Sequence, residues 1–216
     1  MERRRFLQWG TAAIVGTAVL GACTGDNSGK ARPGQPPTTA APDTSSGAGP
    51  TDLTLAKTAA SLEALLIDAY KQLMDSHIVT SSALLTYTNL FLDHHNQHLA
   101  ALNGIITTTA GQAAVSDPNA VMKNQIVKPA LDAAQTQDDF AHLFFTLEDA
   151  IAQTYVYAST AMSRPDLRSS MMSIGGIEAR HRALLGVQVE QLRLDDLFPS
   201  AFARADNPLP PDALLT

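Results

Sequence analysis

The feature that most constrains the fold of this chain is a pattern of polar residues that occurs twice. In each copy a glutamate is followed by a tyrosine in a Glu-x6-Tyr spacing, and then by two metal-ligating residue types separated by two positions. On an α-helix these steps turn by about 700° and about 300°, so the members of each pair share a face. The repeat therefore predicts two similar pairs of helices. Its copies are Glu63, Tyr70, His95 and His98, and then Glu148, Tyr155, Glu178 and His181.

The end of the second copy lies in an otherwise apolar helical pattern. Glu178 and His181 share their face with Ile174, Ile177 and Leu185. A carboxylate and an imidazole on a buried face are costly unless they have a partner. A metal ion is such a partner, and Glu-x-x-His is a spacing by which one helix supplies two ligands.

The ordered set of motifs resembles that of the ferritin-like superfamily over roughly residues 52–192. In that family a four-helix bundle holds a pair of metal ions, with a glutamate from helices 1 and 3 and Glu-x-x-His from helices 2 and 4. The resemblance implies an all-α fold, an up-down four-helix bundle with a long crossover between helices 2 and 3. It also implies a set of metal ligands: Glu63, His95, His98, Glu148, Glu178 and His181.

One position departs from the family pattern, because His95 stands where the family has a carboxylate. The site would then combine carboxylates and imidazoles in equal number, a mixture that suits iron, manganese or zinc. The resemblance implies a di-iron centre, with Mn or Zn as alternatives. Because a neutral imidazole removes one negative charge, His95 favours a mononuclear site or zinc over a diferric centre.

Two further features leave alternatives open. Asp93 or His94 could take the place of His95, or the donor-rich segment around them could hold a separate metal ion at the surface. Tyr70 and Tyr155 either bond to the ligands or relay electrons, or they pack in the bundle core.

Apolar periodicity and capping signals predict four long helices. Between the second and third the chain lacks a strong core pattern, and Pro129 is expected to interrupt a short helix there. Gly175 and Gly176 lie inside the fourth helix, where their small size favours a close helix approach or a bend. The predicted long helices cover about residues 52–76, 80–104, 138–162 and 165–192, and the short one covers about 119–134.

Residues 1–22 have the features of an export signal. A run of arginines precedes an apolar stretch that is too short for a comfortable membrane span, and Cys23 follows Leu-Gly-Ala as in a bacterial lipobox. We therefore expect cleavage before Cys23 and acylation of this residue; the alternative is an ordinary signal with an incidental cysteine. The sequence Arg-Arg-x-Phe-Leu also resembles a twin-arginine motif, which leaves the choice between Sec and twin-arginine export open.

The rest of the chain divides into further segments. Residues 23–50 contain the lipidated cysteine and a linker rich in Gly, Pro, Ser and Thr, which predicts disorder. Residues 51–192 form the expected bundle, and the Pro-rich tail 193–216 is expected to pack on it. The protein would then be exported and held at the outer face of the cytoplasmic membrane or elsewhere in the cell envelope.

Composition narrows the range of partners. The formal net charge of −6 argues against nucleic acid and against electrostatic docking on anionic lipid. Cys23 is the only cysteine, so an intramolecular disulfide cannot form. The sequence contains no nucleophile elbow, phosphate loop, dinucleotide fingerprint or Cys-x-x-Cys motif. The expected partners are therefore metal ions and, through the lipid anchor, a membrane.

Two functions of different classes follow from these features. The first is a membrane-anchored ferritin-like metal-binding protein, with a dinuclear Fe or Mn site and oxidase, ferroxidase or peroxide-related activity. A metal scavenger or chaperone would use the same site without turnover. The second function is a cell-surface binding or scaffold module without redox turnover, which His95 favours and the pair of Glu178 and His181 opposes.

Overall fold

The computed structural model describes residues 51–188, 209 and 211–215, and every regular element in this part of the chain is helical. The all-α fold class is thereby confirmed. None of the described helices is long and apolar enough to cross a membrane. The elements are α1 (Asp52–Ser76), α2 (Ser82–Ala110), α3 (Ala120–Met122), the π-helix η1 (Lys123–Val127), α4 (Lys128–Ala133), α5 (Gln137–Ala161), α6 (Pro165–Gln188) and the 3-10 helix η2 (Pro211–Ala213).

The helices begin and end at residues suited to those positions. The Thr51 side chain accepts a hydrogen bond from the backbone N–H of Thr54 and caps α1. A capping box formed by Thr136 and Asp139 starts α5. Gly111 ends α2 in the left-handed conformation, with φ 62°, which glycine adopts without strain. These caps mark where α1 and α5 begin and where α2 ends.

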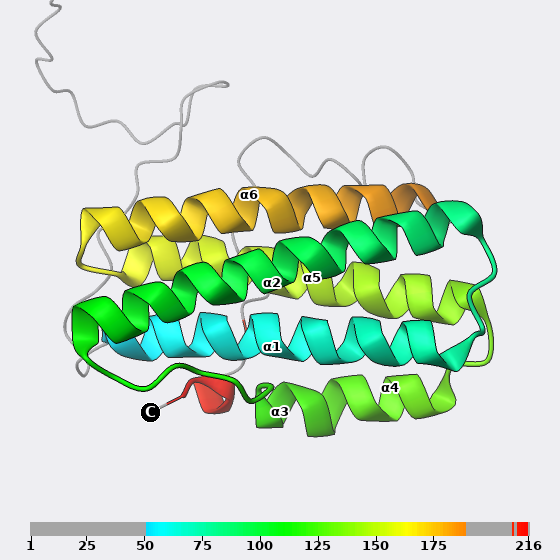
Figure 1. Cartoon of the computed structure of the whole chain (residues 1–216), viewed down its shortest axis with the longest axis horizontal. Helices are drawn as coiled ribbons and strands as arrows, with labels where there is room; N and C mark the ends of the chain where they lie inside the picture. The colour runs from blue at the N-terminus through cyan, green and yellow to red at the C-terminus, as the bar shows by residue number, and fades with distance from the viewer. Residues whose placement is uncertain (1–50, 189–208, 210, 216) are drawn as a thin grey trace, which may run out of the picture. The chain divides into compact units, whose positions relative to one another are not determined.

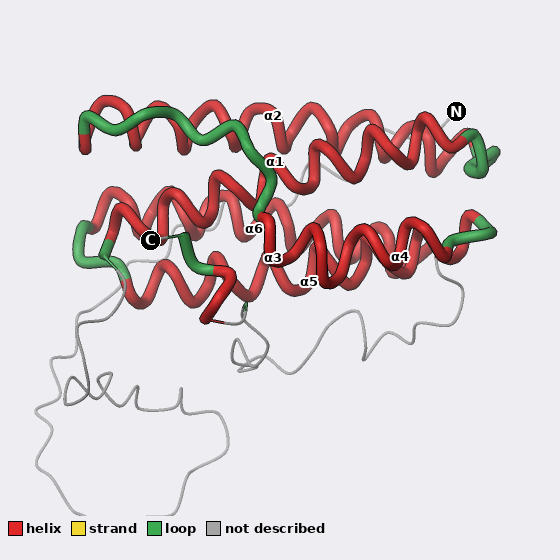
Figure 2. The backbone as a smooth tube through the Cα atoms, turned by 90° about the horizontal axis from the view of Figure 1, so that it is seen from below, coloured by secondary structure: helices red, strands yellow, loops and turns green. Residues whose placement is uncertain are grey.

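The long helices form two antiparallel pairs (Figure 1). The helices α1 and α2 join at one end of the bundle, and α5 and α6 join at the opposite end (Figures 1 and 2). The helix α1 packs against α2 and α5, while α6 packs against α5 and α2. This arrangement requires a crossover that runs along the bundle between the two pairs, as in four-helix bundles with a long connection.

The second helix is longer than predicted. It continues through Gly104 to Ala110, so the expected end at residues 103–104 was wrong. Gly104 has no neighbouring atom near the position of a Cβ, and Thr108 donates to its carbonyl over 2.5 Å. A glycine inside a helix costs only about 1 kcal/mol, which the surrounding helical turns absorb. Buried Ile106 anchors this last part of α2 in the core.

The crossover contains a continuous helical segment from Ala120 to Ala133. We expected Pro129 to interrupt it, but the chain instead forms the π-helix η1, which ends at Val127, two residues before this proline. A proline clashes with the carbonyl one α-turn earlier and cannot donate a hydrogen bond. The wider π-turn accommodates both defects, so the helix continues past Pro129.

Buried Asn119 attaches the crossover to the bundle. Its Nδ2 donates to Ser61 Oγ over 3.1 Å and to the Ala213 carbonyl over 2.8 Å. Its Oδ1 accepts from the Met122 N–H over 3.2 Å and so caps α3. One side chain therefore joins α1, the crossover and the C-terminal η2, and no sequence motif marks this asparagine.

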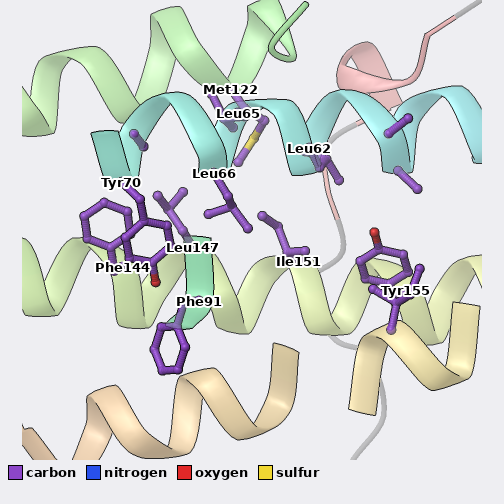
Figure 3. Close-up of a cluster of buried hydrophobic side chains, with 14 of the residues drawn as sticks. Leu62, Leu65, Leu66, Tyr70, Phe91, Met122, Phe144, Leu147, Ile151 and Tyr155 are labelled. Carbon is purple, nitrogen blue, oxygen red and sulfur yellow. The ribbon is translucent and has the colours of Figure 1, made fainter. Parts of the chain in front are cut away.

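The bundle core combines large aliphatic and aromatic side chains from all four long helices. Figure 3 shows part of this core, with labelled residues from α1, α2 and α5. Tyr70 of α1 stacks on Phe144 of α5, with ring centroids 3.9 Å apart. Met122 brings the crossover against the same core beside Leu65. The predicted end of the fourth helix at residue 192 and the packing of the tail over 193–208 lie outside the described residues.

Candidate metal centre

All six residues with metal-ligating side chains singled out by the repeat come together inside the bundle. Each long helix contributes: α1 supplies one residue, α2 two, α5 one and α6 two. Five of them are buried, and the side chain of His98 is 13% exposed. They form two overlapping groups whose potential ligand atoms all lie within 4.8 Å of one another. The first ligand group is Glu63, His95, His98 and Glu178, and the second ligand group is His95, Glu148, Glu178 and His181.

The first ligand group is held together by short contacts between imidazoles and carboxylates. Oε2 of Glu63 lies 2.9 Å from Nδ1 of His95 and 3.6 Å from Nδ1 of His98. Nδ1 of His98 also lies 2.8 Å from Oε1 of Glu178. Carboxylates of α1 and α6 thus face two histidines of α2, which are three positions apart and share a helix face.

The second ligand group repeats this arrangement on the other side of His95. Nε2 of His95 lies 3.2 Å from Oε1 of Glu148. Nδ1 of His181 lies 3.2 Å from Oε2 of Glu178 and 3.5 Å from Oε2 of Glu148. The two nitrogens of the His95 ring therefore face different groups, and Glu178 belongs to both.

Several of these polar atoms are buried without a hydrogen bond. Among the described residues, they include Nδ1 of His98, Oε2 of Glu148 and Oε1 of Glu178. Nδ1 of His98 and Oε1 of Glu178 lie 2.8 Å apart without the geometry of a hydrogen bond. A buried polar atom without a partner is rare and costly. Convergent nitrogen and oxygen atoms of this kind fit the ligand set of a first-row metal ion.

The carboxylates differ in their proton affinity. Burial would raise the pKa of Glu148, but the nearby charge of His95 lowers it well below its ordinary value. Burial would also raise the pKa of Glu63, but the hydrogen bond with His95 outweighs it and lowers this pKa. In Glu178 burial raises the pKa, and the negative charge of Glu148 raises it further. The shared carboxylate is therefore the one that most needs an additional positive charge.

The histidines respond in the opposite direction. Burial lowers the pKa of His95, but the charge of Glu148 outweighs it and raises this pKa well above the ordinary value. Burial lowers the pKa of His98 as well, but the close carboxylates of Glu178 and Glu63 outweigh it and raise this pKa to about 9. A protonated imidazole and a metal ion are thus alternative cations for the same carboxylates.

The tyrosines of the repeat bond to the ligands across the bundle. Tyr70 of α1 donates to Oε1 of Glu148 on α5 over 2.7 Å, and Tyr155 of α5 donates to Oε1 of Glu63 on α1. Each tyrosine therefore bonds to the glutamate of the other copy of the repeat. Burial and the carboxylates raise the pKa of both hydroxyls, which keeps them neutral donors. Both residues also pack in the core, so bonding to the glutamates and core packing occur together. A role as electron relays stays a prediction.

Two neighbours of His181 complete the surroundings. Nδ1 of His94 lies 2.9 Å from Nε2 of His181, and the Phe91 ring stacks on the His181 ring with centroids 4.0 Å apart. His94 is half-buried, so it joins the buried ligand to the surface. In the sequence, His94 lies four positions before His98, which is about one helical turn, and this spacing places it near the ligands.

The alternative ligands do not join the ligand groups. Neither group of the described part of the chain includes Asp93 or His94. Asp93 is exposed, and its Oδ2 accepts a hydrogen bond from Gln97 over 2.8 Å. The frame with His95 and His98 is therefore the one that the helix presents to the interior.

Comparisons with known proteins agree with this geometry. The family model described as a ferritin-like domain matches residues 51–191 of the chain. No curated protein and no solved structure matches it. The match covers all four long helices and each member of both ligand groups.

Proposed function

Because this chain belongs to the family of ferritin-like domains, we propose that it is a membrane-anchored protein whose bundle binds a pair of iron or manganese ions. The observation that carries the proposal is the pair of overlapping ligand groups that share His95 and Glu178. When bound there, such ions would supply electron transfer to dioxygen or a peroxide, as in an oxidase, a ferroxidase or a peroxide-consuming protein.

Each residue has a definable part in this proposal. Glu63 and His98 would hold one ion, and Glu148 and His181 would hold the other. Glu178 belongs to both ligand groups, so its carboxylate would serve both ions. His95 differs from a carboxylate because a neutral imidazole ligates through one nitrogen only, so it makes the two positions unequal.

The surroundings control orientation, water and protons. Tyr70 and Tyr155 fix one oxygen of Glu148 and of Glu63 by hydrogen bonds, which leaves the other oxygen for an ion. Buried Phe91 excludes water on the side of His181. His98 is the one ligand of the six with a partly exposed side chain, so small reactants would reach the ions beside it.

Metal content tests the proposal directly. The full chain is expressed with Fe, Mn and Zn supplied, and bound metal is measured by elemental analysis. We expect about two ions per chain, lost in the double variant Glu148→Ala/Glu178→Ala. The control Asp75→Ala/Asp93→Ala removes the same charge from exposed sites and should retain the metal. Loaded protein is then assayed for consumption of dioxygen and hydrogen peroxide.

A second candidate function is a cell-surface binding or scaffold module without redox turnover. The observation that favours it is His95, which contacts Glu63 and Glu148 through its two nitrogens and can itself neutralise them. In that case no metal would be found above background, and Fe, Mn and Zn would cause no thermal shift. About one ion per chain would instead indicate a mononuclear site altered by His95.

The proposed anchor has its own test. In a bacterial host, the wild-type protein should sediment with the membrane fraction and incorporate labelled palmitate. Cys23→Ser should prevent both, because it removes the only thiol that can be acylated. Equal sedimentation of the two proteins would refute lipid anchoring and leave the metal centre unaffected.

A further inference from the structure

A pocket with a volume of about 420 Å³ lies between α1 and α5, on the side where the C-terminal residues pack. Of the described residues that line it, four belong to α1 and four to α5, and the others are Leu209 and Leu214. The volume falls within the usual range for small-molecule sites.

The lining determines the chemical class of the ligand. Among the residues that the structure describes, no charged side chain lines the pocket. The Thr58 hydroxyl accepts from the Leu215 N–H over 2.9 Å, and the Thr154 hydroxyl donates to the Ala150 carbonyl over 2.7 Å. An ionised ligand would therefore be buried without a partner, at considerable cost. The pocket suits a neutral and largely apolar molecule.

The volume also limits the size of the ligand. A dry apolar cavity of about 150 Å³ accepts a benzene molecule. By this comparison the pocket takes a molecule of roughly ten to twenty non-hydrogen atoms.

Tyr155 connects the pocket to the metal centre. This residue lines the pocket, and its hydroxyl donates to Glu63 of the first ligand group. Gly175 of α6 lies behind the residue, where a Cβ would approach Tyr155 Cβ to 2.8 Å. The tyrosine is thus held between α6 and the pocket, so a molecule in the pocket would restrict its movement further.

We propose that this pocket binds a neutral, apolar small molecule and that Tyr155 couples its occupancy to the metal centre through Glu63. The coupling rests on the proposed metal site, whereas binding to the pocket does not. Occupancy should favour the orientation in which Tyr155 holds Glu63, and should thereby tighten metal binding.

The binding half is tested with naphthalene as the probe and the full-length chain in the presence of a chelator. Ala59→Leu and Ala158→Leu each fill part of the pocket, while Ala100→Leu and Ala161→Leu make the same change at exposed positions. We expect saturable binding to the wild type and both controls, and at least about tenfold weaker binding to the pocket variants.

Folding of each variant is checked by circular dichroism. Leu214→Trp fills the pocket from the chain end and provides a second test if a variant within α1 or α5 fails to fold. No saturable binding to the wild type, or equal affinity in pocket and control variants, would overturn the inference.

The coupling half is tested by titrating Co²⁺ with and without saturating naphthalene. In the wild type we expect naphthalene to tighten Co²⁺ binding by about threefold or more. Tyr155→Phe keeps the ring and should still bind naphthalene, but it should lose the coupling. Tyr70→Phe removes the matching hydroxyl from Glu148, away from the pocket, and should retain the coupling.

The outcomes separate the two proposals. Co²⁺ binding that naphthalene does not change would overturn the coupling while leaving the metal site intact. Absence of Co²⁺ binding would overturn the proposed function and the coupling together. Naphthalene binding would then still establish the pocket.

Discussion

At the scale of single residues, His95 is the position that most distinguishes this centre. Its ring nitrogens lie 2.9 Å from Glu63 and 3.2 Å from Glu148, so one side chain touches both ligand groups. A carboxylate in this place would bring a negative charge to both. The imidazole brings none, and when protonated it stabilises the same glutamates that an ion would bind.

His98 gives the metal-free protein a pH-dependent stability. Glu178 and Glu63 raise its pKa in the folded state to about 9, whereas the unfolded value is about 6.5. The resulting stabilisation is complete below pH about 6.5 and is lost as the pH rises toward about 9. We expect the free energy of unfolding in urea with chelator to fall by on the order of 2 kcal/mol over this range.

His98→Gln isolates this contribution, since the variant cannot gain the proton. It should show a smaller loss of stability between these pH values than the wild type. His142→Gln removes an exposed histidine and should behave as the wild type does. An equal loss in wild type and His98→Gln would contradict the assignment.

At the scale of secondary-structure elements, the contact between α5 and α6 depends on Gly175. A Cβ at this position would come within 2.8 Å of Tyr155 Cβ, whereas a Cβ at Gly176 would meet no atom within 4 Å. Only the first of the two adjacent glycines is therefore required by the packing of α5 against α6. Gly175 permits a close helix approach, which confirms one of the two expectations for this pair, and Gly176 does not.

This difference predicts opposite effects of the same substitution. Gly175→Ala should lower the free energy of unfolding by about 1–3 kcal/mol, because α5 and α6 must separate. Gly176→Ala should raise it by up to about 1 kcal/mol through helix propensity. Urea unfolding of both variants measures the difference, and a stabilising Gly175→Ala would disprove the close approach.

The crossover provides a second prediction for an element. Asn119→Ala removes the bonds to Ser61 and Ala213 and the cap of α3. Because these groups are buried, we expect a loss of about 2–4 kcal/mol in urea unfolding. Asn89→Ala is the control: Asn89 is exposed and bonds only within α2, so its loss should stay within about 0.5 kcal/mol. Similar losses would show that the crossover is attached by other contacts.

At the scale of the whole molecule, the apolar core and the metal centre contribute separately to stability. The core extends along all four long helices, and the carboxylates of the centre contact histidines. We therefore expect chelator-treated protein to keep its helical circular dichroism signal. Its melting temperature should rise when Mn²⁺ is added, corresponding to about 2.7 kcal/mol at one hundred times the dissociation constant.

Metal affinity should decrease as the pH falls, because the imidazoles and carboxylates must lose protons to bind. Calorimetric thermal scans at several pH values measure both effects. Glu148→Ala/Glu178→Ala should show no Mn²⁺-dependent shift. Loss of helical structure on chelation would instead mean that the metal holds the bundle together.

Much of the fold follows from local signals in the sequence. The capping residue Thr51, the first-turn Pro165 and the apolar periodicity fix where helices lie, because these effects operate within a few residues. The end of α2 and the path past Pro129 could not be predicted in this way. Packing of Ile106 and a π-turn override local preference there.

For the centre, the sequence by itself determined which side chains share a helix face, since helical geometry makes residues three or seven positions apart neighbours. It thereby selected all the members of both ligand groups, whose role as ligands stays a prediction. It could not determine how the two copies of the repeat face each other.

Only the tertiary structure decided that question. The helices α1 and α5 run in opposite directions, so Tyr70 lies opposite Glu148 and Tyr155 lies opposite Glu63. The same packing brought His94 next to His181 and formed the apolar pocket that Tyr155 lines. These contacts join residues far apart in the chain, and their distances are set by the docking of helix on helix rather than by the spacing within any one helix.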